Sequence, residues 1–244
     1  MVKCEIHTHT QYSHDSYLNF YGYLIRLKMK KINIVGITDH NEIEGAISFK
    51  KKLKKFGIDV IVGEEIFTES GEVIGLFLKE KIKPGLSLKE TIKEIKKQKG
   101  LVYIPHPYDL KRNKTVIPFE EIKKYKKEID FIEIHNGRNI EEYYSEIQYE
   151  IYNEISDYVV PVVGSDAHTF FELGRNYMNI NNFAYEGDPK EFKKMISNAN
   201  FNKKKCLPIF HEITKIVRVV KHLSKGDFNG LFRIAKKKFK RRFV

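Results

Sequence analysis

The stretch Glu5–Ser16, which reads EIHTHTQYSHDS, places three of the chain's nine histidines within one short segment. Its first half is typical of a β-strand, and His7 and His9 lie two residues apart on it. Because side chains alternate along a strand, this spacing puts both imidazoles on one face, where one metal ion can bind them together. We expect Glu5 to share that face and support a ligand from behind, and Cys4 to point the other way.

The rest of the chain alternates short apolar runs with longer charged stretches of helical period. Strands are expected at 3–9, 32–40, 58–66, 72–78, 101–107, 129–137 and 158–168. Helices are expected at 20–31, 42–56, 87–100, 118–128, 140–156 and 188–197. Ser87 and Gly100 are the start and stop signals of one helix, and Asn41 is a candidate cap of another. The alternation predicts an α/β fold with a parallel sheet, and about seven units favour a closed barrel.

The composition excludes several classes of protein. The chain has 244 residues, and its hydrophobic fraction of 41% is ordinary for a globular protein. No apolar run is long enough to cross a membrane, and the first residues lack the apolar core of a secretory signal. Two cysteines, Cys4 and Cys206, make no disulfide framework. We therefore expect a cytoplasmic protein with reduced thiols.

The formal net charge of +12 is concentrated near the C-terminus. Fourteen basic and two acidic residues lie in 203–244, so the remaining 1–202 carries equal numbers of both signs. This asymmetry predicts two functional parts, a body over 1–202 and a basic helical extension over 203–244. Within the extension, an amphipathic helix places these apolar residues at helical spacing: Ile209, Ile213, Ile216, Val217 and Val220.

We expect this amphipathic helix to dock on the barrel. The last segment, Leu231–Val244, mixes phenylalanines with basic residues and is expected to bind a partner. That partner is an anionic membrane surface, RNA or an acidic protein, and charge does not distinguish the three. The expected location is therefore the cytoplasm, with peripheral attachment to a membrane as one alternative.

Residues that can bind metal follow nearly every expected strand. The carboxyl ends of parallel strands in a barrel meet at one mouth, so these residues are expected to converge. Each segment alone is also typical of a turn or a cap, but the set as a whole points to a metal centre. Imidazoles with carboxylates suit Zn, Mn or Fe. The residues are His7, His9, Asp39, His40, Glu64, Glu65, Glu72, His106, His135, Asn136, Asp166 and His168.

The ordered segments HTHTQYSHDS, GITDH, VGEEI, YIPHP, IEIHNGR and GSDAH resemble the PHP family, named for polymerase and histidinol phosphatase. The resemblance covers roughly residues 2–200. It implies a distorted (β/α)7 TIM-like barrel with two or three divalent metals, Mn, Fe or Zn, at its carboxyl mouth. It also implies that the chain hydrolyses phosphate esters. The positions that match family ligands are His7, His9, Asp15, His40, Glu65, His106, Asp166 and His168.

Two positions depart from the family pattern. Glu72 stands where members with three metals often have histidine, and Asn136, next to His135, stands where many members have histidine. All three residues remain candidate ligands, so the number of metals stays open. Because neighbours on a strand face opposite ways, only one of Glu64 and Glu65 faces the site, and the resemblance favours Glu65 as the carboxylate shared by two metals.

The leading hypothesis is metal-dependent hydrolysis of a phosphate mono- or diester by a metal-bridged hydroxide. The substrate would be a small phosphomonoester, a nucleotide or a short oligonucleotide. Asp166 is expected to move a proton, and Arg138, Arg175 and His14 to bind the substrate phosphate, with Arg138 and His14 also counted as catalytic candidates. The alternatives are a hydrolase of another bond type and a non-catalytic metal-bound module recruited through its basic tail.

Overall fold

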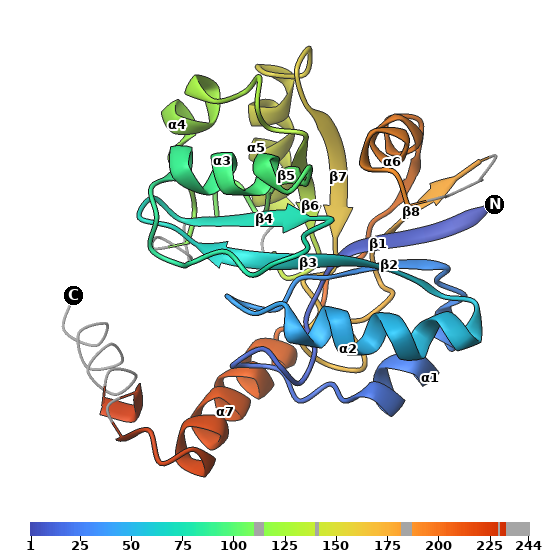
Figure 1. Cartoon of the computed structure of the whole chain (residues 1–244), viewed down its shortest axis with the longest axis vertical. Coiled ribbons are helices and arrows are strands. Elements are labelled where there is room, and N and C mark those ends of the chain that lie inside the picture. The colour runs from blue at the N-terminus through green and yellow to red at the C-terminus, as the bar shows by residue number, and fades with distance from the viewer. Residues whose placement is uncertain (110–114, 140–141, 182–186, 229, 233–244) are drawn as a thin grey trace.

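The computed structural model describes the chain except for residues 110–114, 140–141, 182–186, 229 and 233–244 (Figure 1). The described residues form one nine-stranded sheet in the order β7-β6-β5-β4-β3-β2-β1-β8-β9. The strands are β1 (Val2–Thr8), β2 (Ile34–Ile37), β3 (Asp59–Phe67), β4 (Glu72–Leu76), β5 (Leu101–Ile104), β6 (Phe131–Asn136), β7 (Val160–Gly164), β8 (Tyr177–Ile180) and β9 (Asn200–Asn202). The helices are α1 (Phe20–Lys30), α2 (Glu44–Leu53), η1 (Lys54–Phe56), α3 (Leu88–Lys97), α4 (Phe119–Lys124), α5 (Glu142–Asn153), α6 (Pro189–Ile196) and α7 (Ile209–Ser224).

The sheet closes on itself where β1 ends. Thr8 forms a parallel bridge with Ala167, just beyond β7. The amide of Asp166 donates to the carbonyl of His7 at 3.0 Å, and the amide of His9 donates to the carbonyl of Ala167 at 2.9 Å. These bonds join the two ends of the β1–β7 sheet into a nearly closed barrel, which confirms the expected fold class.

The pairing is not parallel throughout. β3 and β5 each pair with β4 antiparallel, whereas β1, β2, β3 and then β5, β6, β7 pair parallel. A tight turn joins β3 to β4, with the amide of Thr68 donating to the carbonyl of Gly71 at 2.7 Å. A connection this short cannot make a parallel crossover, so β4 must reverse direction. Glu72, at the start of β4, therefore lies at the same end of the barrel as the carboxyl ends of the other strands.

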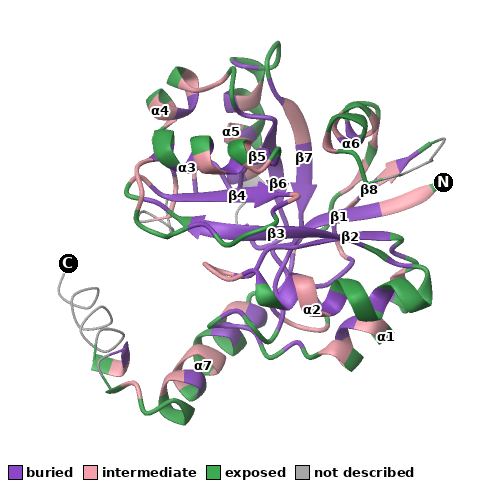
Figure 2. Cartoon of the chain, in the orientation of Figure 1, coloured by how far each residue is buried: buried purple, intermediate pink, exposed green. Residues whose placement is uncertain are grey.

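Two apolar layers hold the strands in place. One face of the sheet packs against α1 to α5 through residues such as Val35, Phe49 and Ile92. The opposite face encloses a second cluster that includes Ile34, Phe131 and the α6 residue Phe192. Figure 2 shows the strands buried along most of their length, with exposed residues confined mainly to the outer helix surfaces and loops. Burial on both faces is why these strands read as apolar runs.

The first strand departs from simple alternation. Its register with β2 shifts between Glu5 and Thr8. As a result Cys4 packs with Ile6 in the second apolar cluster, and Oε2 of Glu5 accepts a hydrogen bond from the amide of Gly174 at 2.7 Å. The expectation that Cys4 points outward and Glu5 supports the histidines is therefore wrong, because a strand irregularity changes the face on which later side chains lie.

Of the two residues expected to cap helix starts, one does so. Ser87 and Glu90 form a capping box at the start of α3, which confirms that start. Asn41 does not cap α2, since its Oδ1 accepts the amide of Phe67 at 2.8 Å. The side chain of Glu42 instead accepts the amides of Ile43 and Glu44 at the entrance to this helix.

The first helix of the extension is α7, which docks on the barrel as expected. Phe210, Thr214 and Lys221 are its buried residues, whereas Ile213 and Ile216 on the apolar face are exposed. The contact with the barrel is therefore made by the first three residues and not by Ile213 and Ile216.

On the barrel side, the ring of Phe171 stacks on Phe210. The first loop offers the carboxylate of Asp15 and two backbone carbonyls to the basic side chains of α7. Of the proposed partner-binding segment, residues 233–244 lie outside the described residues. No described helix has both the length and the apolar character needed to cross a membrane.

Candidate metal centre

The centre of the site is a buried group of four side chains from three strand ends. Nε2 of His7 lies 3.5 Å from Oε1 of Glu65 and 3.6 Å from Oδ1 of Asp166. Nε2 of His9 lies 3.3 Å from Oε2 of Glu65 and 3.3 Å from Oδ1 of Asp166. Their ligand atoms all lie within 4.8 Å of one another, a spacing that can hold a metal ion.

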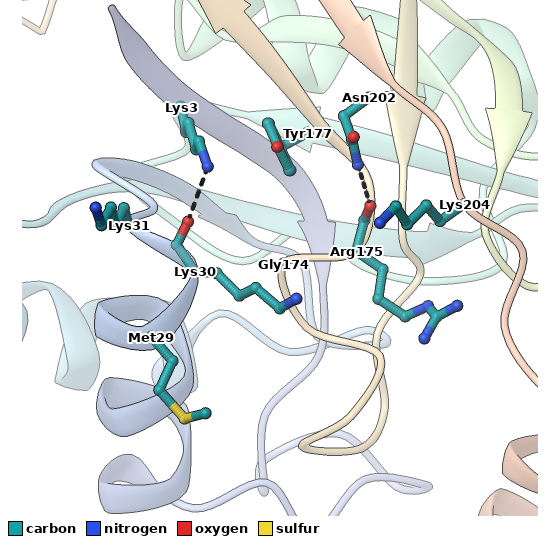
Figure 3. Close-up of a pocket in the computed structure, with 9 residues that line it drawn as sticks. All are labelled: Lys3, Met29, Lys30, Lys31, Gly174, Arg175, Tyr177, Asn202 and Lys204. Atoms are coloured by element: carbon teal, nitrogen blue, oxygen red, sulfur yellow. Dashed lines mark hydrogen bonds between the residues drawn. The ribbon is translucent and has the colours of Figure 1, made fainter.

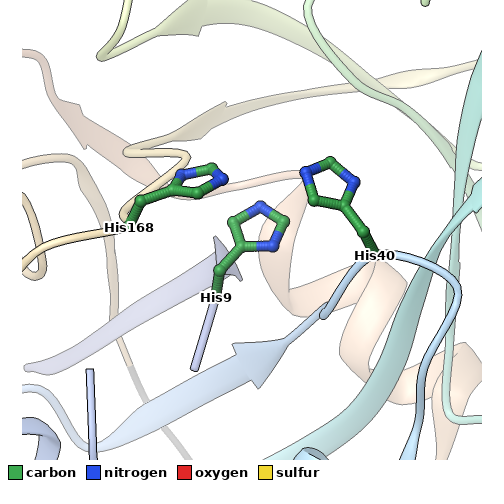
Figure 4. A group of neighbouring side chains, drawn as sticks. All are labelled: His9, His40 and His168. Atoms are coloured by element: carbon green, nitrogen blue, oxygen red, sulfur yellow. The ribbon is translucent and has the colours of Figure 1, made fainter. Parts of the chain in front are cut away.

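A second group adjoins the first through three histidines. The ring of His9 stacks on those of His40 and His168, with centroid distances of 4.6 Å and 4.1 Å, and the last two rings lie 5.8 Å apart (Figure 4). The three rings come from the ends of β1, β2 and β7, which are far apart in sequence. Three imidazoles this close to one another favour binding of a cation, because protonating all of them would be strongly unfavourable.

Asp15, from the loop after β1, approaches this second group from the outside. Its carboxylate lies 3.3 Å from Nε2 of His168 and 3.6 Å from Nε2 of His40. His14 also lies 3.6 Å from Asp15, and its side chain is 46% exposed, so it faces the opening of the site.

A third group forms around β4. Glu72 lies 3.5 Å from Nδ1 of His40 and 3.5 Å from Nε2 of His106, and His106 lies 3.1 Å from Oε1 of Glu65. The departure from the family pattern at Glu72 therefore still places a carboxylate next to two imidazoles. Glu64, the neighbour of Glu65, points elsewhere, since its Oε2 accepts the amide of Ile82 at 2.9 Å.

Several donor atoms of the site are buried without a hydrogen-bond partner among the described residues. They are Nε2 of His7, both ring nitrogens of His9 and Oε2 of Glu65. Buried polar atoms are normally satisfied, because leaving one unpaired costs about 1–3 kcal/mol. Donors of this kind, gathered in one buried cluster, fit divalent metal ions.

The charges of the site are mutually dependent. Burial raises the pKa of Glu65, but the nearby imidazoles of His40 and His7 outweigh it and hold this pKa well below its usual range. Burial lowers the pKa of His7, but the carboxylates of Asp166, Glu133 and Glu65 together raise it well above its usual range. The ionised carboxylates of the site are thus stabilised by positive charge on the neighbouring imidazoles. A bound cation would supply that positive charge instead.

Glu133 on β6 supports the first group from behind, and the sequence analysis missed it. Its Oε1 lies 3.0 Å from Nδ1 of His7 and accepts the hydroxyl of Tyr103, while its Oε2 accepts the amide of His106 at 2.6 Å. A carboxylate on the far nitrogen fixes the tautomer of a ligating histidine and aims its other nitrogen. The signal was its place on the strand of the segment IEIHN, two residues before His135 and three before Asn136.

His135 and Asn136 differ in position. Nδ1 of His135 lies 3.0 Å from the hydroxyl of Ser145 on α5, and His135 belongs to none of the metal-capable groups found among the described residues. Nδ2 of Asn136 donates to Oε2 of Glu133 at 2.8 Å and to Oδ2 of Asp166 at 3.4 Å. Through these two hydrogen bonds, the side-chain nitrogen of Asn136 links the carboxylates of Glu133 and Asp166.

The side chains of the two candidate arginines contact residues other than the metal-capable ones. Nη2 of Arg138 donates to the hydroxyl of Thr214 at 3.0 Å, and its Nε lies 3.6 Å from Glu172, so Arg138 joins the barrel to α7. Arg175 donates to the carbonyl of Lys205 at 2.6 Å.

Arg175 lines a basic pocket of about 290 Å³ with Lys3, Lys30 and Lys204, shown in Figure 3. Lys3 precedes His9 by six residues on one strand, a separation of about 20 Å. This pocket is therefore at the other end of β1 from the metal-capable groups.

The sequence analysis also missed two cations from α7. Nη2 of Arg218 donates to Oδ2 of Asp15 at 2.8 Å, and Nζ of Lys221 donates to the carbonyls of Gln11 and Ser13 at 2.6 Å each. Both contacts secure the loop that carries Asp15. No local sequence pattern could find them, because the partners are about 200 residues apart.

The family model of the PHP domain matches residues 5–202, which include all the metal-capable residues described above. This chain belongs to the PHP domain family. The match ends before α7, so Arg218 and Lys221 come from outside the span of the model. The PHP-type barrel, distorted by the antiparallel strand β4, agrees with the expectation from sequence.

Two uncharacterized proteins of Methanocaldococcus jannaschii are similar to this PHP chain. One is 34% identical over 203 residues, covering 80% of this chain and 79% of that protein. The other is 46% identical over 117 residues, covering 44% of this chain and 68% of that protein.

Solved structures share the fold at lower identity. A two-domain protein from Bacteroides vulgatus, described as containing a predicted PHP-like metal-dependent phosphoesterase, has a TM-score of 0.67 and 16% identity, with 83% of this chain and 65% of that longer chain covered. PsfC from Pseudomonas syringae has a TM-score of 0.65 and 14% identity, covering 90% and 98%. An amidohydrolase from Chromobacterium violaceum has a TM-score of 0.56 and 14% identity, covering 86% and 95%. At these identities the likeness is one of fold.

Proposed function

We propose that this PHP chain hydrolyses a phosphate mono- or diester with two or three divalent metal ions, Mn, Fe or Zn, held at the barrel mouth. One observation carries the proposal: the carboxylate of Glu65 faces two sets of imidazoles. Its Oε1 lies near His7 and His106, and its Oε2 lies near His9 and His40. A carboxylate between two sets of nitrogen donors is suited to be shared by two metals.

The metal-capable groups place the donor side chains around several neighbouring metal positions. His7, His9, Glu65 and Asp166 form the most buried group. The other donors lie around it, and they are His14, Asp15, His40, Glu72 and His168. When bound, divalent ions supply a Lewis acid for phosphoryl oxygens and lower the pKa of water. The mixture of nitrogen and oxygen donors without thiolate suits Mn, Fe or Zn.

The residues of the chain have distinct roles in this proposal. Asp166 lies in the central group and is hydrogen bonded by Asn136, which orients its carboxylate toward His7 and His9. We assign proton transfer to Asp166. Its backbone has a φ of 52°, and His106 has a φ of 32°, conformations that are uncommon for residues other than glycine. Such strain is often kept at functional sites, where surrounding contacts hold it.

Substrate phosphate needs cations at the opening of the site. Arg218 is the described cation in direct contact with a metal-capable residue, and its side chain is 39% exposed. His14 lies on the other side of Asp15 and is also partly exposed. We therefore assign phosphate binding to Arg218 and His14, and assign Arg138 to holding α7. α7 lies beside the opening, which favours a small phosphomonoester, a nucleotide or the end of a short single strand.

A substrate panel tests the proposal. Purified chain loaded with Mn, Fe or Zn is assayed on p-nitrophenyl phosphate, bis-p-nitrophenyl phosphate, nucleotides and short RNA, and in parallel on carboxamides. We expect phosphate or nucleotide release that falls at least about 100-fold in His9→Ala and Glu65→Gln. Glu64→Gln is the matched control, because Glu64 is a buried neighbour that points away from the site.

Two outcomes would contradict the proposal. Turnover of carboxamides alone would favour a hydrolase of another bond type. Confirmed metal binding with no turnover of any substrate would favour a non-catalytic metal-bound module.

A further inference from the structure

The pocket at the far end of β1 from the metal centre is surrounded by positive charge. Its lining residues include five cations and no acid. The cations are Lys3 of β1, Lys30 and Lys31 at the end of α1, Arg175 before β8 and Lys204 after β9. Within the described residues, none of the five forms an ion pair with a carboxylate. A cavity of about 290 Å³ therefore gathers five positive charges without a counter-charge.

These cations lie close enough to repel one another. Figure 3 shows the side chains of Lys30 and Lys204 extending toward Arg175. The pKa of Lys30 is lowered from its ordinary value by burial first, and then by the positive charges of Arg26, Lys204, Arg175 and Lys3. The carboxyl end of α1 offsets only about half of one charge, and the carbonyl of Lys30 already accepts Nζ of Lys3 at 3.3 Å. Most of the repulsion remains, and a bound anion would relieve it.

Hydrogen bonds hold the backbone around the pocket in place. Nη2 of Arg175 donates to the carbonyl of Lys205 at 2.6 Å, and the carbonyl of Arg175 accepts Nδ2 of Asn202 at 2.6 Å. The fully buried side chain of Asn176 bonds both backbone groups of Lys204. The ammonium group of Lys204 makes no hydrogen bond in the part of the chain that is described, so it is available to a ligand. An anion would thus meet donors on an ordered backbone, which reduces the entropic cost of binding.

Gly174 brings the loop before β8 against the end of α1. Its φ of 73° lies in the region that favours glycine, and a Cβ there would lie 2.6 Å from Cγ of Lys30. The amide of Gly174 donates to Oε2 of Glu5 at 2.7 Å. Glu5 is fully buried, so this carboxylate is closed off from a ligand in the pocket. The segments that carry Lys30 and Arg175 are therefore held side by side.

We propose that this pocket binds a small ligand through a di- or triphosphate group. A single phosphate carries about two negative charges at neutral pH, whereas linked phosphates concentrate more charge in a small volume and match five cations better. Nζ of Lys3 lies over the ring of Tyr177 at 4.6 Å, so this ring is not free to stack on a base. An RNA strand spreads its charge along its length and gains from such stacking, so it fits the pocket less well. Inorganic tripolyphosphate and a nucleoside triphosphate are two sources of the same group.

Isothermal titration calorimetry of the full chain measures this binding. The His9→Ala chain is titrated beside the wild type, so that phosphates bound at the metal centre are told apart from those in the pocket. We expect tripolyphosphate and ATP to bind both chains with dissociation constants of roughly 1–100 µM, which increase as salt is added. Equal affinities would identify the phosphates as the whole recognised group. Tighter binding of ATP would add a contact with the nucleoside, and either result supports the proposal.

A double variant of the pocket tests its location. Lys30→Ala with Arg175→Ala removes two of the five cations and should weaken binding of tripolyphosphate about 100-fold, the effect of losing two partly screened charge-assisted contacts. Lys51→Ala with Lys55→Ala is the matched control, because it removes the same charge from exposed residues of α2 and η1. The control should bind like the wild type. Circular dichroism checks that both double variants are folded.

Lysine acetylation of the wild-type chain is a second test, and it needs no change in the pocket. A bound polyphosphate covers the ammonium groups of Lys30 and Lys204, so tripolyphosphate should slow their acetylation severalfold. Lys51 and Lys55 should react at the same rate with and without the ligand. Mass spectrometry of the digested chain measures each rate.

Four results would overturn the proposal. The first is no binding of tripolyphosphate or ATP below about 1 mM, whether or not short RNA binds. The second is full binding by the folded pocket variant, or an equal loss in the Lys51 and Lys55 control. The third is loss of binding in His9→Ala, because the phosphates would then lie at the metal centre. The fourth is equal protection of Lys51 and Lys30 from acetylation.

Discussion

Arg218 on α7 donates to the carboxylate of Asp15 at 2.8 Å, across 203 residues of sequence. Asp15 is buried and contacts His40 and His168, so the guanidinium reaches the edge of the metal-capable groups. Those groups lie within the span that matches the PHP model, whereas Arg218 lies beyond it. The extension therefore contributes a side chain to the site itself.

Replacing Arg218 tests this contribution. We expect Arg218→Ala to raise the KM for a phosphate substrate about tenfold, the effect of losing one partly screened charge-assisted hydrogen bond. Arg218→Lys should recover part of the loss, because the charge remains while the planar geometry does not. Steady-state kinetics measures both. Lys215→Ala, which removes an exposed ion pair with Glu212 on the same helix, should leave KM unchanged.

Glu133 should control metal affinity without binding metal. Glu133→Gln removes the negative charge that lies 3.0 Å from Nδ1 of His7. We expect metal affinity to fall about 10–100-fold while the fold is kept, since loss of a carboxylate behind a ligating histidine typically has this effect. Competition with a chelating dye measures the affinity. An unchanged affinity would show that His7 does not depend on Glu133 for its orientation.

Metal binding should stabilise the folded chain. At a free metal concentration 100 times the dissociation constant, the gain is about 2.7 kcal/mol. For a chain of this size that corresponds to a rise in Tm of about 5–10 °C. Thermal unfolding with chelator and then with excess Mn measures the difference. His9→Ala should show a much smaller rise, and an equal rise in that variant would mean that the metal binds elsewhere.

A pair of glycines tests the close packing of the barrel. A Cβ on Gly36 of β2 would lie 2.8 Å from Cα of Ile6 on β1, a contact with backbone that cannot move aside. We expect Gly36→Ala to destabilise the fold by about 1–3 kcal/mol. A Cβ on Gly22 in α1 would meet its nearest atom at 3.4 Å, so Gly22→Ala should be neutral or stabilising by up to about 1 kcal/mol. Urea unfolding of the two variants gives the comparison.

Cys206 should react slowly at neutral pH. Burial, with a smaller contribution from Glu172, raises the pKa of its thiol to about 11. The thiolate is the reactive form, so iodoacetamide should modify the folded chain at pH 8 more than about 100-fold slower than the unfolded chain. The rate should climb as the pH approaches 11.

The same shift affects stability. The folded pKa of Cys206 lies above the unfolded value, so the contribution of this thiol to the free energy of unfolding is full below about pH 8.5 and is lost as the pH rises toward 11.

Mass spectrometry of the iodoacetamide-treated chain measures the rate of alkylation of Cys206. Equal rates in the folded and unfolded chain at pH 8 would contradict the burial of this thiol.

The sequence predicted the features that local pattern determines. The seven expected strands and the six expected helices appear in the structure, because apolar runs and charged helical stretches differ plainly in period. The convergence of His9, His40 and Glu65 also followed from strand ends meeting at one mouth. β8 and β9 were not predicted, since each has only three or four residues.

The errors share a physical cause, which is long-range packing that changes a local rule. The register shift in β1 turned Glu5 and Cys4 away from their expected directions. The contacts of Arg218 and Lys221 with the loop of Asp15, which the sequence analysis missed, join segments about 200 residues apart. In both cases the deciding partner lies far away in the sequence, where periodicity carries no information.

The distance in sequence between Asp15 and Arg218 has a consequence for synthesis of the chain. A ribosome that has completed the first two hundred residues has already made every imidazole and carboxylate of the central group. Arg218, which donates to Asp15, leaves the ribosome later. A product cut by proteolysis before α7 would thus keep the metal-capable residues of the barrel. It would lack the guanidinium of Arg218, which contacts Asp15 at the edge of the site.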